Sequence, residues 1–469
     1  MRIQRRVCFL GFEQKRILVE KVVGRALIHT SFDGYLLKLN DSLGTTRDAP
    51  SVGVNVMRIL SLFRRRYAFI QGNFLILLIT WILMNFAAPI PQTYASLYFL
   101  ELGATEFILG VIGFAGALSI ALVQFPGGYL ADKHGRRKLI LTMTFGVAFS
   151  FIFYILAPTW HFVVIGAMLQ NLCLIYQPAL IAMMLDSVTP ENRGAGYTLQ
   201  SVITRLASLP ASVIAGFIVL SLGLNIGMRI AYTIVLVAFT VAAILRVKLK
   251  ETLSNNESSH ISLVKALEDY PSAVKESLRV WKKLPATAFY LFIAQAGMFS
   301  LNMACYLYFV VYATIHLGIQ QFEWAIVMAF MSFSIAIPSI LAGLKMDKSD
   351  RKFFLVLGFL LYIPAMLLFL NADFNTLLIS FFFFGLGQTL QFTSYQSLLG
   401  DLTPRDLRGR VVGCSQFFLY ITVAVVQLAA GALYTYMSPQ LPFLLLAFFA
   451  IPFSLLVFFK VSEPKKREI

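Results

Sequence analysis

The chain alternates between long apolar runs and short polar loops. Twelve runs are long enough to cross a bilayer, because a helix needs about 20 mostly apolar residues to span the hydrocarbon core. The runs are continuous and lack the period-two alternation of barrel strands, so they predict helices. The expected spans lie near 70–100, 107–131, 138–157, 161–185, 196–221, 226–246, 287–315, 322–344, 353–371, 375–399, 410–436 and 440–461. The predicted fold class is an all-α membrane protein with twelve transmembrane helices.

Composition and charge support a membrane protein rather than a nucleic-acid-binding one. The chain is 58% hydrophobic and only 13% charged, whereas soluble domains are about 45–50% apolar. Its net charge is +16, but the basic residues sit in loops. With loops assigned alternately to two sides, 27 Lys and Arg residues from Arg64 onward lie on one side and only Arg229 on the other. This asymmetry predicts that both termini are cytoplasmic.

No sequence pattern indicates a metal site, a cofactor or an enzyme. The four cysteines form no CxxC pair and the five histidines no HExxH motif, so we expect no disulfide and no metal. The chain has no GxxxxGK[ST] segment and no GxSxG segment. We therefore expect no ATPase module, no cofactor and no catalytic residues.

The sequence repeats itself at an offset of 215 residues. The segment Gly128-x-x-x-Asp132-Lys133-x-Gly135-Arg136-Arg137 recurs as Gly343-x-x-x-Asp347-Lys348-x-Asp350-Arg351-Lys352. Asp186 and Arg193 recur as Asp401 and Arg408, and the segment LGATEF recurs as LGIQQF, at the same offset. Three matches in one register predict two homologous halves of six spans each.

The repeat sets the expected domain limits. These are an N-terminal extension over 1–66, a first bundle over 67–246, a central cytoplasmic loop over 247–286, a second bundle over 287–462 and a tail over 463–469. The extension is weakly patterned, and residues 1–56 are either a cytoplasmic extension or sequence upstream of a start at Met57. In the central loop, Val274, Leu278 and Trp281 have the spacing of an amphipathic surface helix; a plain tether is the alternative.

The first of the repeated loops resembles the signature loop between spans 2 and 3 of the major facilitator superfamily of secondary transporters. The degenerate second copy between spans 8 and 9 and the long central loop add to the resemblance, which covers about 67–462. It implies two pseudo-symmetric six-helix bundles that move a small solute by alternating access.

The resemblance also implies charged contacts at the cytoplasmic end. Asp132 would face the start of span 11, because a helix N-terminus attracts a carboxylate, and Arg136 would pair with Asp186. By the repeat, Asp347 would face the start of span 5, and Arg351 would pair with Asp401. These contacts are expected to cross between the halves and to close the cytoplasmic side; the alternative is that they only fix topology. The predicted gate residues are Gly128, Asp132, Lys133, Gly135, Arg136, Arg137, Asp186, Arg193, Gly343, Asp347, Lys348, Arg351, Asp401 and Arg408. Asp350 departs from the signature, where the first copy has glycine.

Polar residues recur seven positions apart in spans 1, 4, 7 and 10, which line the central cavity in the family. Two helical turns separate the members of each pair, so they share a face, and that face should avoid lipid. The predicted cavity residues are Asn85, Gln92, Tyr94, Gln170, Gln177, Arg205, Gln295, Asn302, Tyr306, Gln388, Gln391 and Tyr395. The alternative is interhelical amide bonding that holds the bundle together.

Arg205 is the one charged residue expected within a span. It either receives an anionic group of a substrate or is structural, bonding to helix carbonyls or pairing with Asp186, and we favour the structural interpretation. No Asp or Glu lies in the middle of a span, so the usual mid-membrane proton carrier is missing and proton coupling stays open.

The sequence predicts a monomeric, multi-pass transporter of a small organic solute in the plasma membrane, either secondary active or facilitative. Drug or metabolite efflux and uptake of a polar nutrient both remain open. A transporter-like sensor without net transport is the alternative.

Overall fold

The computed structural model describes residues 69–252, 285–345, 350–403 and 408–462. Within these ranges, twelve helical segments are long and apolar enough to cross a membrane. They coincide with the twelve spans predicted from the sequence, which are therefore confirmed. The expected extension over 1–66 and the expected surface helix around Trp281 lie outside the described residues.

Three spans of the first bundle are interrupted at prolines. Pro89 and Pro178 lie in the first turn of a new helix, and Pro210 directly precedes one; proline lacks the N–H that would continue the preceding helix. The six spans are α4 (Gly72–Ala87) with α5 (Pro89–Gln92) and α6 (Ala95–Glu101), then α7 (Glu106–His134), α8 (Arg136–Ile155), α9 (Trp160–Cys173) with η1 (Leu174–Tyr176) and α10 (Gln177–Asp186), η2 (Pro190–Asn192) with α11 (Arg193–Ser208) and α12 (Ala211–Leu222), and α13 (Leu224–Arg246).

The second bundle repeats the six-span plan with fewer interruptions. Its spans are α15 (Ala286–Val311) with a π-helical turn η3 (Tyr312–His316), α16 (Gln321–Lys345), α17 (Arg351–Leu360) with α18 (Tyr362–Phe369), α19 (Phe374–Leu402), α20 (Arg408–Tyr436) and α21 (Leu441–Lys460). Phe309 lies at the centre of its core, with its ring within 5.5 Å, centroid to centroid, of those of Phe369, Phe381, Phe384 and Phe443.

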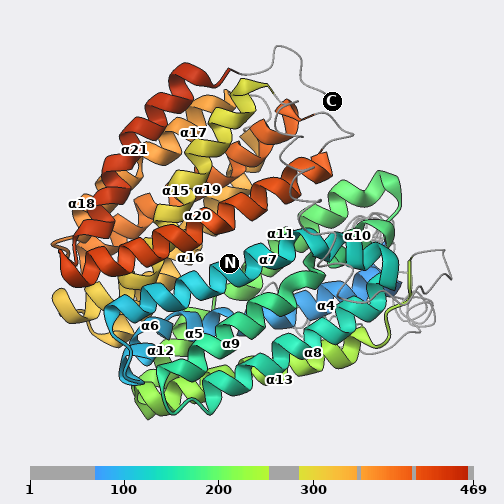
Figure 1. Cartoon of the computed structure of the whole chain (residues 1–469), viewed down its shortest axis with the longest axis horizontal. Coiled ribbons are helices and arrows are strands. Elements are labelled where there is room, and N and C mark those ends of the chain that lie inside the picture. The colour runs from blue at the N-terminus through green and yellow to red at the C-terminus, as the bar shows by residue number, and fades with distance from the viewer. Residues whose placement is uncertain (1–68, 253–284, 346–349, 404–407, 463–469) are drawn as a thin grey trace, which may run out of the picture. The chain divides into compact units, whose positions relative to one another are not determined.

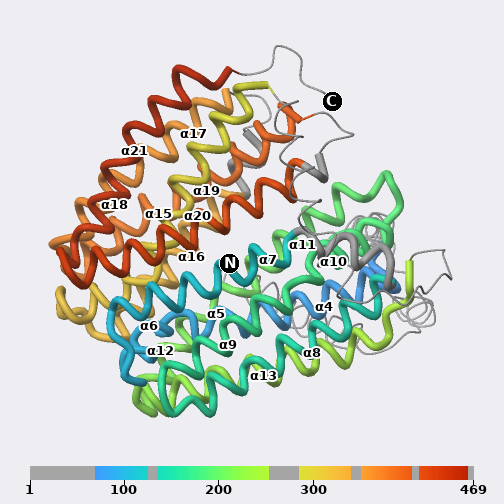
Figure 2. The backbone as a smooth tube through the Cα atoms, in the orientation of Figure 1, coloured from blue at the N-terminus to red at the C-terminus, as the bar shows by residue number. Residues whose placement is uncertain are grey.

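The two bundles meet along α7 and α20, which lie side by side in Figures 1 and 2. Small residues allow this approach: a Cβ atom at Gly110 would lie 3.0 Å from the Cα atom of Gly431. A second seam runs between α12 and α16, where the Phe217 and Phe322 rings stack edge-on at 5.2 Å between centroids. Close packing of small residues is the usual way in which membrane helices associate, since lipid provides no hydrophobic drive between them.

Each bundle has two ends, which we name by their loops. The basic end carries the turns at Gly135 and Asp350, and the opposite end carries Glu106 and Gly318. Successive spans alternate in direction between the two ends, as the short loops require.

Candidate functional site: a polar cavity between the bundles

A cavity of about 200 Å³ lies where the two bundles face each other. Arg205 of α11 lines it from the first bundle, and α15, α16 and α19 line it from the second. Five of the residues predicted for the cavity meet there, namely Arg205, Gln295, Asn302, Gln388 and Gln391. Phe299, Ile335, Thr389, Phe392 and Thr393 complete the lining.

Four side chains beside this cavity form a hydrogen-bonded chain that runs in one direction. The Asn302 amide donates to the Tyr362 hydroxyl oxygen at 3.0 Å. That hydroxyl donates to Gln391 Oε1 at 2.6 Å, and Gln391 Nε2 donates to Gln295 Oε1 at 3.1 Å. The chain joins three spans of the second bundle, so these amides do hold helices together, as the alternative interpretation proposed. It also fixes the Gln295 carbonyl as an acceptor and leaves the Gln295 amide N–H groups to the cavity.

Arg205 lies in the last turn of α11, where span 5 is broken before Pro210. The carbonyl groups at a helix C-terminus favour a nearby cation, so the break provides a favourable place for the guanidinium within the membrane. Its predicted structural partner, Asp186, is instead bonded to Arg136. None of the described residues forms a hydrogen bond or ion pair with the Arg205 guanidinium.

The other predicted cavity residues are not among those that line this space. The Asn85 amide donates to the Trp81 carbonyl of its own helix, and Gln170 accepts a hydrogen bond from Tyr154. The Tyr94 hydroxyl donates to the Gln321 carbonyl of the second bundle, at the opposite end. Gln92 and Gln177 are exposed, Tyr306 is partly buried and Tyr395 is buried. Seven-residue spacing therefore predicts a shared face but not its depth in the membrane.

The predicted ion pairs Arg136–Asp186 and Arg351–Asp401 are both present. They stand 215 residues apart, at equivalent positions of the two halves. The expectation that they cross between the halves is wrong: Arg136 begins α8 and Asp186 ends α10 within the first bundle, and Arg351 and Asp401 both belong to the second. The members of each pair are only 50 residues apart in sequence, and a 215-residue repeat keeps such neighbours in one bundle.

The two copies of the signature turn are built differently. Gly135 has φ +84°, a conformation that glycine adopts without steric cost. A Cβ atom there would also lie 2.9 Å from the Glu251 carboxylate. At the equivalent position Asp350 has φ −65° and caps α17 by accepting a hydrogen bond from the Phe353 N–H at 3.1 Å. The departure from the signature thus replaces a glycine turn by a helix N-cap.

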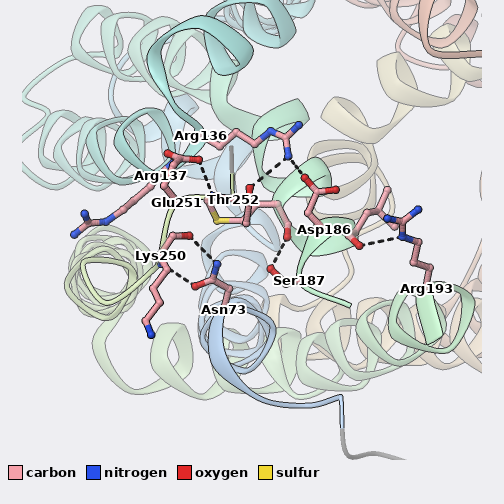
Figure 3. A network of polar contacts seen from close by, with 11 residues as sticks. Asn73, Arg136, Arg137, Asp186, Ser187, Arg193, Lys250, Glu251 and Thr252 are labelled. Carbon is pink, nitrogen blue, oxygen red and sulfur yellow. Dashed lines mark hydrogen bonds and ion pairs between the residues drawn. The ribbon is translucent and has the colours of Figure 1, made fainter. Parts of the chain in front are cut away.

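A clamp that the sequence analysis missed surrounds the first of these turns (Figure 3). Glu251 accepts a hydrogen bond from the Arg137 backbone N–H at 3.0 Å, and the Arg137 side chain donates to the Val247 carbonyl at 2.9 Å. Asn73 bonds both the carbonyl and the N–H of Lys250, at 2.7 and 2.8 Å. Residues 247–252, expected to begin the central loop, therefore fasten span 6 to spans 1 and 3. The charged run after span 6 was the available signal.

Several predicted gate residues lack a described side chain. Gly128, Asp132 and Lys133 lie in α7, Gly343 lies in α16 and Arg408 begins α20, whereas Asp347 and Lys348 fall outside the described residues. Arg193 donates to the Leu185 carbonyl at 3.2 Å rather than to a carboxylate.

Two further arginines are held by uncharged groups. Arg229 donates to Asn225 and to the carbonyls of Ile155 and Ala157, at the end of α8. Arg246 is fully buried in the last turn of α13, where it donates to Thr80 and Thr144 and lies 5.6 Å from the centroid of the Tyr176 ring. These arginines show what a structural arginine looks like in this fold.

Side-chain hydrogen bonds between the bundles lie at the opposite end. Among the described residues, the Trp324 indole donates to the Thr93 carbonyl at 3.0 Å, and the Tyr308 hydroxyl donates to the Glu106 carbonyl at 3.1 Å. The Tyr94–Gln321 bond is the third. The bundles are therefore joined at the end away from the ion pairs.

Twelve membrane-crossing helices in two repeated bundles, with a polar cavity between them, define a multi-pass membrane transporter. The sequence model of the Major Facilitator Superfamily matches residues 69–355 and 298–469. The chain belongs to this superfamily.

Known relatives agree with this assignment. An uncharacterized MFS-type transporter of Methanocaldococcus jannaschii is 22% identical over 366 residues, 76% of this chain and 87% of that protein. A POT family transporter crystallised with 5-aminolevulinic acid superposes with a TM-score of 0.66 at 14% identity, covering 82% of this chain and 95% of that one. The D-xylose–proton symporter gives a TM-score of 0.66 at 14% identity, covering 84% and 98%. These structures share the fold.

Proposed function

We propose that the protein moves a small organic solute across the membrane by alternating access, with the cavity at Arg205, Gln295 and Gln388 as the solute site. The observation that carries this proposal is the position of the cavity: polar groups from both bundles meet within an apolar body. A solute held there contacts both halves, so a rocking motion of one against the other would carry the site from one end to the other.

We infer that the present arrangement is the one closed at the opposite end. Its supports are the Trp324–Thr93 and Tyr308–Glu106 hydrogen bonds and the close contact of Gly110 with Gly431. The solute then reaches the cavity from the basic end, which the loop charges assign to the cytoplasm of a plasma-membrane protein. The ion pairs of Arg136 and Arg351 brace the rim of each bundle, and the cross-bundle contacts of Asp132 and Asp347 remain predictions.

Cysteine accessibility tests the alternating mechanism without a known solute. Gln388→Cys, in a chain whose four native cysteines are replaced by serine, should react with an impermeant thiol reagent added from either side of sealed vesicles. The reagent would thus reach Gln388→Cys, on the second-bundle wall of the cavity, from each side of the membrane in turn. Labelling from one side only would contradict alternating access.

A disulfide at the second seam supplies the matched control. An added Cβ atom at Gly216 would lie 2.6 Å from that of Ala325, so a small outward shift brings a Gly216→Cys/Ala325→Cys pair to bonding distance. Oxidation should restrict labelling of Gln388→Cys to the basic side, and reduction should restore the other side. Each single cysteine should have no such effect.

Net movement separates a transporter from a transporter-like sensor. Solutes that raise the unfolding temperature of the purified protein are chosen first, because a ligand of the folded state stabilises it. Each is then offered to proteoliposomes that contain the reducible Gly216→Cys/Ala325→Cys pair. Uptake that stops on oxidation and returns on reduction supports transport; stabilisation without any uptake supports a sensor.

A further inference from the structure

The Arg205 guanidinium carries a charge that no other described residue neutralises. Arg229 and Arg246 each donate to at least two oxygen atoms, whereas Arg205 has no hydrogen bond or ion pair through its side chain. Asp186, the acid that the sequence analysis offered as a partner for Arg205, is paired with Arg136 instead. A cation at membrane depth without a partner is costly, so a missing counter-anion is the simplest explanation.

The residues across the cavity from Arg205 present further donors. Because Gln391 donates to Gln295 Oε1, the Gln295 carbonyl is occupied and its N–H groups remain available. The Gln388 amide has no hydrogen bond to another described residue. No carboxylate is among the side chains that line this cavity. The site therefore favours an acceptor group with negative charge.

The remaining lining suits an apolar body. Phe299 and Phe392 lie on the second-bundle side of the same cavity. The Asn302 Oδ1 atom is buried and has no hydrogen-bond partner, and Asn302 is only 2% exposed. A carboxylate offers only acceptor oxygens and cannot donate to this atom, so the case for an anion rests on Arg205 and on the amide donors across the cavity.

We propose that the solute is a small organic monoanion, with its carboxylate bound by Arg205 and the Gln295 amide and its apolar part against Phe299 and Phe392. This inference rests on the proposed transport function and names the class of its substrate. One guanidinium without an opposing acid matches one negative charge. A bidentate arginine–carboxylate contact would fix the orientation of that group.

The first test compares three probes of one shape and different charge: benzoate, benzamide and benzylamine. Their effects on the unfolding temperature of the purified full chain give relative affinities. Benzoate should bind at least about tenfold more tightly than benzamide, and Arg205→Gln should remove that preference, because a hydrogen bond to a charged group is lost. Arg205→Lys should keep part of the preference for benzoate. In both variants the affinity for benzamide should change by less than about twofold.

The same variants, without any probe, separate a binding role from a structural one. Arg205→Gln should not lower the unfolding temperature, because Arg205 has no hydrogen bond to another described residue to lose and an unpaired cation is costly in the membrane. Arg229→Gln should lower it, because three hydrogen bonds to Asn225, Ile155 and Ala157 are removed. An equal loss in both variants would overturn the proposal and restore a structural role for Arg205.

A second test measures the charge of the cavity directly. Gln388→Cys should react faster with a sulfonate-bearing methanethiosulfonate than with its trimethylammonium counterpart, and Arg205→Gln should lower that ratio at least about fivefold. An unchanged ratio, or equal binding of benzoate and benzamide, would overturn the inference. Labelling of Gln388→Cys from both sides would then still support alternating access, so failure of the substrate class is distinct from failure of the transport proposal.

Discussion

The Tyr308 hydroxyl of the second bundle donates a 3.1 Å hydrogen bond to the Glu106 carbonyl oxygen of the first. Its ring also stacks on Tyr434 of α20 at 4.5 Å between centroids. The contact thus ties the start of α7 to spans 7 and 11 at the opposite end. It is one of the bonds that must break if the bundles separate there.

Tyr308→Phe should therefore favour the arrangement that is open at the opposite end. The ring packing is kept and only the hydroxyl is lost, which corresponds to about 0.5–1.5 kcal/mol. The shift in the population ratio should be roughly two- to tenfold. Spin labels at Thr159 and Gln440, which are exposed in loops of the two bundles at this end, should report a larger share of long distances. Tyr290→Phe is a control away from this end, and an unchanged distribution would show that the bond does not bias the equilibrium.

The contact between α7 and α20 should not accept a methyl group at Gly431. A Cβ atom there would lie 3.1 Å from both the Gly110 Cα atom and the Phe107 carbonyl oxygen. Gly431→Ala should therefore push the helices apart at the opposite end and expose Tyr308 and Tyr434. Gly413→Ala in the same helix meets nothing within 4 Å and should behave like the unaltered protein. Labelling of Gln388→Cys from the opposite side measures the difference; equal rates in the two variants would contradict this packing argument.

Gly135→Ala should destabilise the first bundle. Its φ of +84° is strained for any residue with a Cβ atom, typically by about 1–3 kcal/mol. Removing the nearby carboxylate by Glu251→Ala should not rescue the variant, since the strain lies in the backbone. The unfolding temperature of the purified protein gives the measurement, with Gly194→Ala as control because nothing lies within 4 Å of that site. A full rescue by Glu251→Ala would assign the effect to the carboxylate contact instead.

The two ion pairs should differ in strength. Asp401 is 17% exposed and Asp186 is 40% exposed, while their arginine partners are 11% and 12% exposed. Loss of the acid takes the ion-pair partner from the guanidinium, and this costs more where water is less accessible. Asp401→Asn should therefore lower the unfolding temperature more than Asp186→Asn. High salt should reduce the effect of Asp186→Asn more than that of Asp401→Asn; the reverse order would contradict the role of burial.

Tyr362→Phe should disturb the cavity without touching it. The Tyr362 hydroxyl accepts from Asn302 and donates to Gln391. Its loss takes the partner from the buried Asn302 N–H and from Gln391 Oε1, at about 1–3 kcal/mol for each group. Gln391 is then free to turn its amide, and Gln295 loses its fixed orientation. Solute affinity should fall together with the unfolding temperature. Tyr290→Phe, outside this hydrogen-bonded chain, should change neither; affinity that stays constant in Tyr362→Phe would show that Gln295 needs no such support.

The sequence alone predicted the twelve spans because their signal is local: apolar length decides a span. The pair Arg136–Asp186 could be predicted because the loop resembles the signature of the superfamily, and the 215-residue repeat extended the same pairing to Arg351–Asp401. Their expected placement across the halves was wrong, because the members of each pair are 50 residues apart and so belong to one 215-residue repeat. Gln295, Asn302 and Gln388 of the cavity were found because a seven-residue spacing selects one helix face, and Gln391 because it lies one turn after Gln388.

Other features depend on tertiary contacts that no local pattern encodes. The clamp joins Asn73 to Lys250, 177 positions away, and Arg137 to Glu251, 114 positions away. Lys250 and Glu251 also lie beyond the expected end of span 6. The burial of Arg246 follows from threonines on two other spans. Tyr94 was expected in the cavity but bonds to the Gln321 carbonyl at the opposite end, where span 1 ends.

The distribution of helix breaks has a mechanical consequence. The helices that meet at the main seam, α7 and α20, each run 29 residues without interruption, whereas spans 1, 4 and 5 are divided at prolines. We therefore expect α7 and α20 to stay straight while the divided spans bend at their breaks. Arg205 lies beside one of these breaks, in the last turn of α11. Bending during a transport cycle would therefore concentrate next to the proposed solute site.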